Sequence, residues 1–260
     1  MSVFRSVLAS ALCAAFLPTA HARENAYDVV GKVLTPYTQI LAAGAKAKNR
    51  ALALELQLEE ASGGDPKLAG TRVRLAVEMP DRLRVTAPLG GERITVCRDG
   101  DRIWAFPGSR LQALLADPAV AKTLPEANRK FKLEPFGLPI PEQQLAFLPI
   151  LFQVTELPDE AVAGQPCRVL ELRLQKELAK SLELKNAKAR IWVGPEYRLL
   201  RLAAQTDEGE ATLRIVDAKF QRALPAETWQ PSQEESGDVM TVSPALYDQI
   251  VRALLGRGKG

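Results

Sequence analysis

Histidine is almost absent from this sequence. Its 260 residues include one histidine, His21, which lies in a segment typical of a cleaved export signal. Arg5 gives that segment a positive start, residues 7–17 form a short apolar run, and residues 20–22 form a small-x-small cleavage site. Cleavage before Arg23 removes the histidine, and a chain without histidine cannot build a Ser–His pair, a Cys–His pair or a His-ligated zinc site. We therefore expect no enzyme, no metal and no cofactor, with carboxylate-only and lysine-based chemistry left open.

Long apolar runs are also missing. The run at residues 7–17 is too short to span a bilayer, and no later segment is longer. Cys13 could suggest a lipid anchor, but Leu12 before it is not small and the apolar run continues beyond it. We therefore expect residues 1–22 to be a signal peptide. The rest of the chain should then be a soluble periplasmic protein of a Gram-negative cell envelope.

Cysteine is scarce, and the mature chain would keep only Cys97 and Cys167. An oxidising compartment favours a disulfide between them. In a simple meander, however, the strand at residues 102–106 lies between the two cysteine strands. Next-nearest strands are about 9.5 Å apart, and a disulfide needs Cα atoms within about 7 Å. The pattern favours two separate thiols and leaves the disulfide open.

An excess of one charge is missing as well. Without Arg5, 33 of the 34 Lys and Arg residues face 31 Asp and Glu residues. This balance excludes the strong basic excess of a nucleic-acid-binding protein, so we expect no nucleic-acid partner. The acidic pairs near residues 59, 99 and 207 lie on turns or strand ends, where solvated carboxylates are more common than a glycosidase pair.

What the sequence does contain is alternation of apolar and polar residues with a period of two. Five such strands lie between residues 52 and 106 and four more between 169 and 215, about nine in all. Helical periodicity predicts helices near residues 25–50, 109–115 and 243–255, and residues 142–152 form a short segment that is apolar on nearly every side. No Ser/Gly-rich linker divides the chain, so residues 23–260 should be a single domain.

The alternation gives each face of the predicted sheet its own chemistry. One face is apolar, and it is either an ordinary core under permanently packed helices or the concavity of a half-open barrel that holds a lipid-like ligand. The other face is either a solvated exterior or a contact surface for anionic head groups or an acidic partner. It carries Arg72, Arg74, Arg82, Arg84, Arg93 and Arg102.

Two motifs resemble the Lol-type periplasmic lipoprotein carriers and receptors. Residues 79–83 read Met-Pro-Asp-Arg-Leu and open a strand, and residues 98–107 read Arg-Asp-Gly-Asp-Arg-Ile-Trp-Ala-Phe-Pro. A weaker match is residues 189–193, Ala-Arg-Ile-Trp-Val. The resemblance implies an α+β fold, an incomplete antiparallel β-barrel (half-barrel) with helices covering the concave face as a lid. One departure is Met79, which stands where the carriers usually have an arginine that ties the lid.

From the resemblance we expect a carrier or binding protein for lipoprotein acyl chains or another lipid-like apolar ligand. The alternative is a non-enzymatic sensor or regulatory module that makes transient contact with a membrane or a membrane protein. A charge at Val85 or Ile94 should then abolish lipid binding without unfolding the protein. The expected ligand-binding residues are Leu75, Val77, Met79, Leu83, Val85, Ile94, Val96, Trp104, Phe147 and Leu148.

Overall fold

The structure is a computed structural model that describes residues 23–41, 50–61, 69–89, 91–116, 148–181, 187–206 and 209–247. The expected signal peptide at residues 1–22 lies outside these ranges, as do Phe147 and the part of the expected C-terminal helix beyond residue 247. None of the helices in the described part of the chain is long and apolar enough to cross a membrane.

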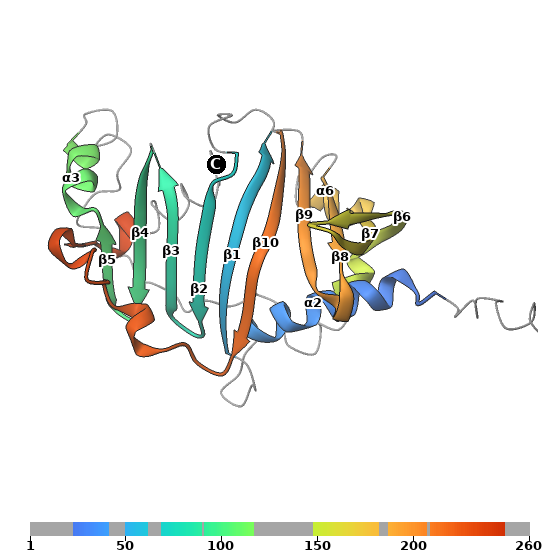
Figure 1. Cartoon of the computed structure of the whole chain (residues 1–260), viewed down its shortest axis with the longest axis horizontal. Helices are drawn as coiled ribbons and strands as arrows, with labels where there is room; N and C mark the ends of the chain where they lie inside the picture. The colour runs from blue at the N-terminus through green and yellow to red at the C-terminus, as the bar shows by residue number, and fades with distance from the viewer. Residues whose placement is uncertain are drawn as a thin grey trace, which may run out of the picture.

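The chain forms two groups of strands, and short helices precede and separate them (Figure 1). The first group follows helix α2 (Ala26–Leu41) and comprises β1 (Ala51–Ala61), β2 (Arg72–Glu78), β3 (Arg82–Leu89), β4 (Glu92–Asp99) and β5 (Arg102–Phe106). Helix α3 (Gly108–Ala116) and the 3-10 turn η3 (Leu148–Leu151) come next. The second group comprises β6 (Phe152–Val162), β7 (Gln165–Leu174), α6 (Lys176–Ser181), β8 (Lys188–Val193), η4 (Pro195–Tyr197), β9 (Leu199–Thr206) and β10 (Gly209–Gln221). The turns η5 (Ala226–Trp229) and η6 (Ser236–Asp238) lead to β11 (Met240–Thr241).

All of these strands form one open sheet of eleven strands, in the order β11-β5-β4-β3-β2-β1-β10-β9-β8-β7-β6. The two groups join where β1 pairs with β10, and neighbouring strands run antiparallel throughout. The sheet does not close, because β11 and β6 lie at opposite edges (Figure 1). This open, antiparallel arrangement fits the expected half-barrel.

The simple meander assumed from the sequence is wrong. The second group of strands returns through β10 to β1 instead of continuing from β5, whose outer neighbour is β11. Strands β6 and β11 were not expected. β6 contains Pro158 and a register shift between Leu157 and Glu160 that interrupts its alternation, and β11 is only 2 residues long.

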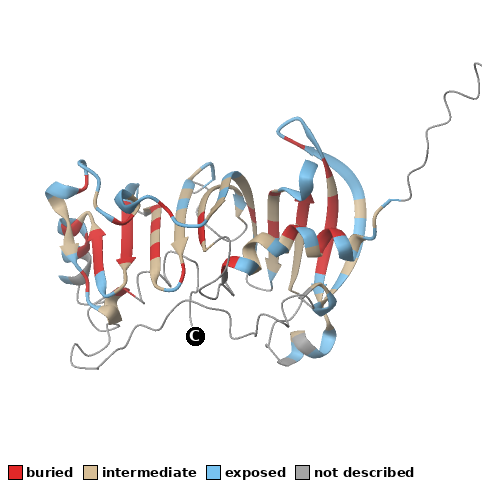
Figure 2. Ribbon diagram, turned by 90° about the horizontal axis from the view of Figure 1, so that it is seen from below, coloured by how far each residue is buried: buried red, intermediate tan, exposed pale blue. Residues whose placement is uncertain are grey.

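Register places the apolar residues of neighbouring strands on one face. Val85 of β3 stands opposite Val96 of β4 and Leu75 of β2, while Arg84 stands opposite Cys97 and Ala76. We call the side with Val85 the apolar face and the side with Arg84 the arginine face. Figure 2 shows that buried residues occur at both ends of the sheet, with intermediate ones between them.

Helix α2 covers one end of the apolar face. Asn25 begins the helix by accepting a hydrogen bond from the backbone N–H of Tyr27 at 2.9 Å. The helix continues through Pro36 as a single element. Its buried stripe, Val29, Val30 and Val33, packs on β7 and β8. The opposite end of the apolar face packs against α3 and the start of a C-terminal helix at residues 244–247.

The segment after β10 crosses the arginine face. We call residues 224–241 the strap; it runs beside β3, β4 and β5 (Figure 1). Trp229 of the strap is buried against Trp104 and Cys97. Both cysteines are free and buried, and they belong to different clusters at the two ends of the sheet. The structure therefore shows two separate thiols, because β4 and β7 are not near neighbours.

Candidate ligand-binding face

Most of the residues expected to bind ligand do share the apolar face. Leu83, Val85, Ile94 and Val96 belong to one buried cluster, against which Leu75 and Val77 pack. Met79 lies in an adjacent cluster with Ile40 of α2 and Leu52 of β1. Phe147 lies outside the described residues, and of Leu148 only its place at the start of η3 is described.

Some of these residues belong to the buried hydrophobic core. Val85 has an exposed fraction of 0% and Ile94 of 1%, and Leu111 of α3 and Tyr247 are buried in the same cluster. A charge at either position would be buried without a partner, which costs several kcal/mol. The expectation that such a variant keeps its fold is therefore wrong, and a test of ligand binding needs a more accessible position.

The accessible part of the apolar face lies in the middle of the sheet, between its two buried ends. Here every apolar side chain keeps part of its surface exposed. The register brings these residues into neighbouring positions, with Leu56 between Val73 and Ile215 and Leu54 next to Leu75. The set comprises Leu54, Leu56, Leu58, Val73, Leu75, Val77, Leu202, Leu213, Ile215, Ala218 and Phe220.

A pocket of about 170 Å³ opens next to this central area, between α2 and the sheet. The helix contributes Val33, Pro36 and Tyr37, and the sheet contributes Ile215 and Phe220 among others. Tyr37 and Phe220 meet edge to face, with ring centroids 5.0 Å apart. Burial raises the pKa of Tyr37, so its hydroxyl stays protonated at neutral pH. Lys32, Glu196, Arg198 and Asp217 also line the pocket, so it is a recess beneath a helix with both apolar and charged walls.

The turn η3 lies against α2. A Cβ atom on Gly31 would lie 3.6 Å from Cγ of Pro149, an ordinary van der Waals distance, so the two segments lie next to each other at this point. Ile150 of η3 is 61% exposed. Gln175 holds η3 to the sheet by donating its backbone N–H to the carbonyl oxygen of Leu151 at 2.9 Å.

Trp104 does not lie with the other expected residues. It stands opposite Cys97 on the arginine face, and its indole Nε1–H donates to the carbonyl oxygen of Trp229 at 3.0 Å. Because the side chains of a strand alternate, Trp104 and Ile103 must face opposite sides. The placement of Trp104 among the ligand-binding residues is therefore wrong for an apolar-face site, and its role is to seat the strap.

The arginine face is largely occupied by interactions within the chain. Arg82 binds Glu78 and Asp99, and Arg72 and Arg74 share Glu55. Guanidinium groups also stack on aromatic rings, as Arg84 does on Trp104 at 5.2 Å. This face is more than a solvated exterior, because the strap covers part of it and ion pairs organise the rest.

Arg84 and Glu235 form the centre of the contact between strap and sheet. Arg84 donates to the carbonyl oxygens of Thr228 and Gln230 and binds Glu235 at 2.7 Å. Burial alone raises the pKa of Glu235. Hydrogen bonds from Ser232 and Thr95 and the charge of Arg84 outweigh that effect, so the pKa is lowered overall. Glu235 is therefore a carboxylate at neutral pH although its side chain is almost fully buried.

Sequence patterns alone missed the central residues of β1 and β10. The alternation of Leu54 and Leu56 was visible, and so was that of Leu213 and Ile215. Nothing local indicated that β1 pairs with β10, which brings these two sets together. Within the described ranges, no group of three or more His, Cys, Asp or Glu side chains could hold a metal ion.

Comparison with known proteins gives matches among solved structures. No family model matches the sequence, and no curated protein matches it. The lipoprotein LppX of Mycobacterium tuberculosis is 13% identical at a TM-score of 0.37, over 74% of this chain and 97% of that one. A LolA superfamily protein of Nitrosomonas europaea, NE2245, is 13% identical at a TM-score of 0.28, over 76% and 96%.

MucB, solved as a Pseudomonas aeruginosa complex with MucA, is 17% identical at a TM-score of 0.40. The match covers 83% of this chain and 64% of the MucB chain, so this chain spans less than two thirds of MucB. These identities and TM-scores carry no argument about family or function. The argument about function rests on the geometry of the chain itself.

Proposed function

We propose that this chain is a periplasmic carrier or binding protein for acyl chains of lipoproteins or for another lipid-like apolar ligand. The observation that carries the proposal is the central apolar area, where neighbouring strands present Leu54, Leu56 and Ile215 partly exposed beside the pocket under α2. A soluble protein rarely leaves a large continuous apolar surface without a binding role.

The chemistry of this area suits a hydrocarbon chain. Its described side chains are aliphatic or aromatic, and they offer shape and apolar surface without hydrogen-bond partners. Each buried methylene contributes about 0.8 kcal/mol, so lengthening the ligand by two carbons should strengthen binding by up to roughly tenfold until the area is filled. Short-chain ligands should bind weakly, because immobilisation of the ligand opposes this gain.

In this proposal α2 and η3 act as the lid of the half-barrel. They pack on the end of the apolar face next to the pocket, and their mutual contact at Gly31 and Pro149 lets them move as one unit. The proposal also includes a signal peptide at residues 1–22 and a single domain at residues 23–260.

The first experiment asks what the purified protein contains. The protein is exported to a bacterial periplasm, purified without detergent, and its lipid extract is analysed by mass spectrometry. We expect acyl-chain lipids in stoichiometric amounts. An extract without lipid, together with no binding of the fluorescent fatty acid cis-parinaric acid, would overturn the proposal.

A pair of variants locates the site. Leu56→Asn places an amide in the central apolar area and should weaken cis-parinaric acid binding about tenfold or more. Leu157→Asn is the matched control, because Leu157 is a partly buried leucine on the arginine face. Equal loss in both variants would place the site elsewhere.

The alternative function is a sensor or regulatory module that contacts a membrane protein. It predicts the opposite pair of results, namely a specific protein recovered by crosslinking in the periplasm and no co-purified lipid.

A further inference from the structure

Two adjoining cavities form a continuous groove on the arginine face. A cavity of about 500 Å³ lies between the strap and strands β2 to β4 and is lined by Arg74, Arg84, Thr86, Arg93 and residues 232–235. A second cavity of about 220 Å³ shares Arg74, Arg84 and Thr86 with it and continues to Asp217 and Lys219 of β10. We call the combined cavity the arginine-face groove.

The groove crosses five neighbouring strands, from β10 through β1, β2 and β3 to β4. Four strand spacings of about 4.8 Å give it a length of about 19 Å. An extended peptide rises about 3.3 Å per residue, so the groove accommodates about six residues of such a chain. Its lining includes Ala53 and Ala76, whose side chains are small.

In the middle of the groove the positive groups are more accessible than the carboxylates that pair with them, whereas at the strap end Glu234 is 79% exposed and its partner Arg93 49%. The side chain of Arg74 is 66% exposed, whereas its partner Glu55 is 20% exposed and is shared with Arg72. Lys219 is 61% exposed and Asp217 is 49% exposed. Glu235 lies beneath the groove, and its side chain is 3% exposed. A ligand in the groove therefore meets more positive than negative charge at its centre, with Glu234 as the main exposed carboxylate at the strap end.

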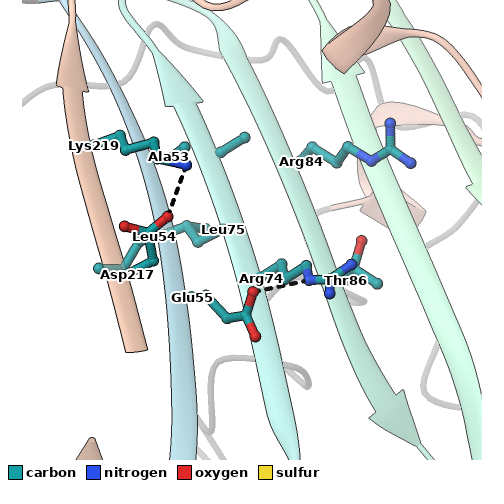
Figure 3. Close-up of a pocket in the computed structure, with 10 residues that line it drawn as sticks. Ala53, Leu54, Glu55, Arg74, Leu75, Arg84, Thr86, Asp217 and Lys219 are labelled. Atoms are coloured by element: carbon teal, nitrogen blue, oxygen red, sulfur yellow. Dashed lines mark hydrogen bonds and ion pairs between the residues drawn. The ribbon is translucent and has the colours of Figure 1, made fainter. Parts of the chain in front are cut away.

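Arginine suits carboxylate recognition because its planar guanidinium can donate two parallel hydrogen bonds. The Nε of Arg74 donates to Glu55, and its guanidinium extends toward Thr86 (Figure 3). The neighbouring Thr86 hydroxyl donates its proton to Thr95 at 3.1 Å, because Thr95 itself donates to Glu235. The guanidinium of Arg74 is therefore the donor that a ligand carboxylate would meet at the middle of the groove.

We propose that the arginine-face groove binds an extended peptide segment that carries acidic side chains. The length of the groove favours a chain over a small anion, and its accessible positive charge selects acidic residues. This surface is on the opposite side of the sheet from the proposed acyl-chain site, so the two proposals can fail separately.

The test uses fluorescence anisotropy with a labelled heptapeptide of alternating Ala and Glu. Two otherwise identical peptides carry Gln or Lys in place of Glu. At about 0.01 M ionic strength the Debye length is about 30 Å, and at 0.15 M it is about 8 Å. We expect the Glu peptide to bind, binding to weaken as salt is raised, and the Gln and Lys peptides to bind much more weakly.

The double variant Arg74→Gln with Lys219→Gln removes two accessible charges of the groove and should weaken binding of the Glu peptide about tenfold. Arg173→Gln is the matched control, because Arg173 is 59% exposed and also paired with a carboxylate, Glu171, but lies on β7 at the far end of the sheet. Thermal unfolding and cis-parinaric acid binding should be the same in the double variant and the control, which shows that fold and apolar face are intact.

Three outcomes would overturn the proposal. The Glu peptide does not bind, or it binds equally to the double variant and to wild type, or the Gln peptide binds as tightly. Vesicles of phosphatidylglycerol and of phosphatidylcholine give a further comparison. If phosphatidylglycerol vesicles bind through Arg74 and Lys219 and the Glu peptide does not, the groove recognises a lipid head group and the peptide proposal is wrong.

Discussion

At the scale of single residues, the side chain of Arg84 holds several residues of the strap on the sheet. It reaches Thr228, Gln230 and Glu235 from the centre of β3. Its charge was read from the sequence as part of an exterior face. What the sequence could not show is that residues more than 140 positions away fold over it, with separations of 144 to 151 residues.

Glu235→Ala should destabilise the protein by about 3–5 kcal/mol, because it leaves the partly buried Arg84 without its charged partner. Urea unfolding followed by circular dichroism measures the change. Glu234→Ala is the control, since Glu234 is 79% exposed and its pair with Arg93 should contribute about 0–1 kcal/mol. Similar effects of both variants would contradict this account of the strap.

Acid should loosen the strap. The pKa of Glu235 is lowered from its ordinary value of 4.5, and hydrogen bonds from Ser109 lower the pKa of Asp238 from 3.8. A carboxyl whose folded pKa is depressed stabilises the fold above its unfolded pKa, and this contribution is lost as the pH falls through the folded pKa. Tryptophan fluorescence of a Trp192→Phe variant, which keeps Trp104 and Trp229, should therefore change below about pH 4. Glu235→Gln should remove most of that fluorescence change. An unaltered acid transition in this variant would argue against the role of Glu235 in holding the strap.

Cys97 should be unreactive in the folded protein. Burial raises the pKa of its thiol to about 12, so almost none is thiolate at neutral pH. We expect Ellman's reagent to modify Cys97 only as fast as the protein unfolds, and urea to expose it at once. Rapid reaction of both Cys97 and Cys167 under native conditions would contradict their buried positions.

At the scale of elements, the junction of α3 with β11 holds the end of the strap. A Cβ atom on Gly108 would lie 3.0 Å from both Cβ and N of Met240. Ala favours a helix over Gly by about 0.5–1 kcal/mol, but this contact should reverse the sign, so that Gly108→Ala costs about 1–3 kcal/mol. Gly237→Ala, where a Cβ meets nothing within 4 Å, is the matched control. Thermal unfolding of the two variants measures the difference. Equal unfolding midpoints would show that α3 and β11 accommodate the added methyl group without loss of stability.

The helices and strands were predictable where a single periodicity, of strand or of helix, runs through the whole segment. Strands β1 to β4 alternate apolar and polar residues, and the structure has all of them together with β5, which was also expected although its alternation is less regular. The amphipathic stripe of α2 likewise predicted a helix that packs on the sheet. β6 was missed because Pro158 and a register shift interrupt its pattern, and because its start follows directly on the apolar turn η3.

At the scale of the whole molecule, alternation fixed which residues share a face but not which strands are neighbours. Leu75, Val85 and Val96 were rightly placed together, because they lie on consecutive strands. The central area could not be predicted, since it needs the pairing of β1 with β10. Burial was equally out of reach, because a period of two does not distinguish the buried Val85 from the partly exposed Leu56.

A bound ligand should stabilise the whole molecule. At a concentration 100 times its dissociation constant, a ligand of the folded state adds about 2.7 kcal/mol to the free energy of unfolding. Hexadecanoic acid should therefore raise the thermal midpoint of the wild-type protein, and Leu56→Asn should reduce the shift. A shift of the same size in Leu56→Asn would mean that the fatty acid binds away from the central apolar area.

The seam between β1 and β10 also bears on how the chain acquires its structure. β1 ends at Ala61 and its partner strand does not begin until Gly209, so this pairing closes a very long loop. Such distant contacts slow folding, because the entropy of loop closure must be overcome before the contacts form. During synthesis the N-terminal group of strands emerges first, with one side of β1 unpaired until β10 arrives. For that interval β1 is an open edge, which leaves the new chain prone to strand pairing with other chains.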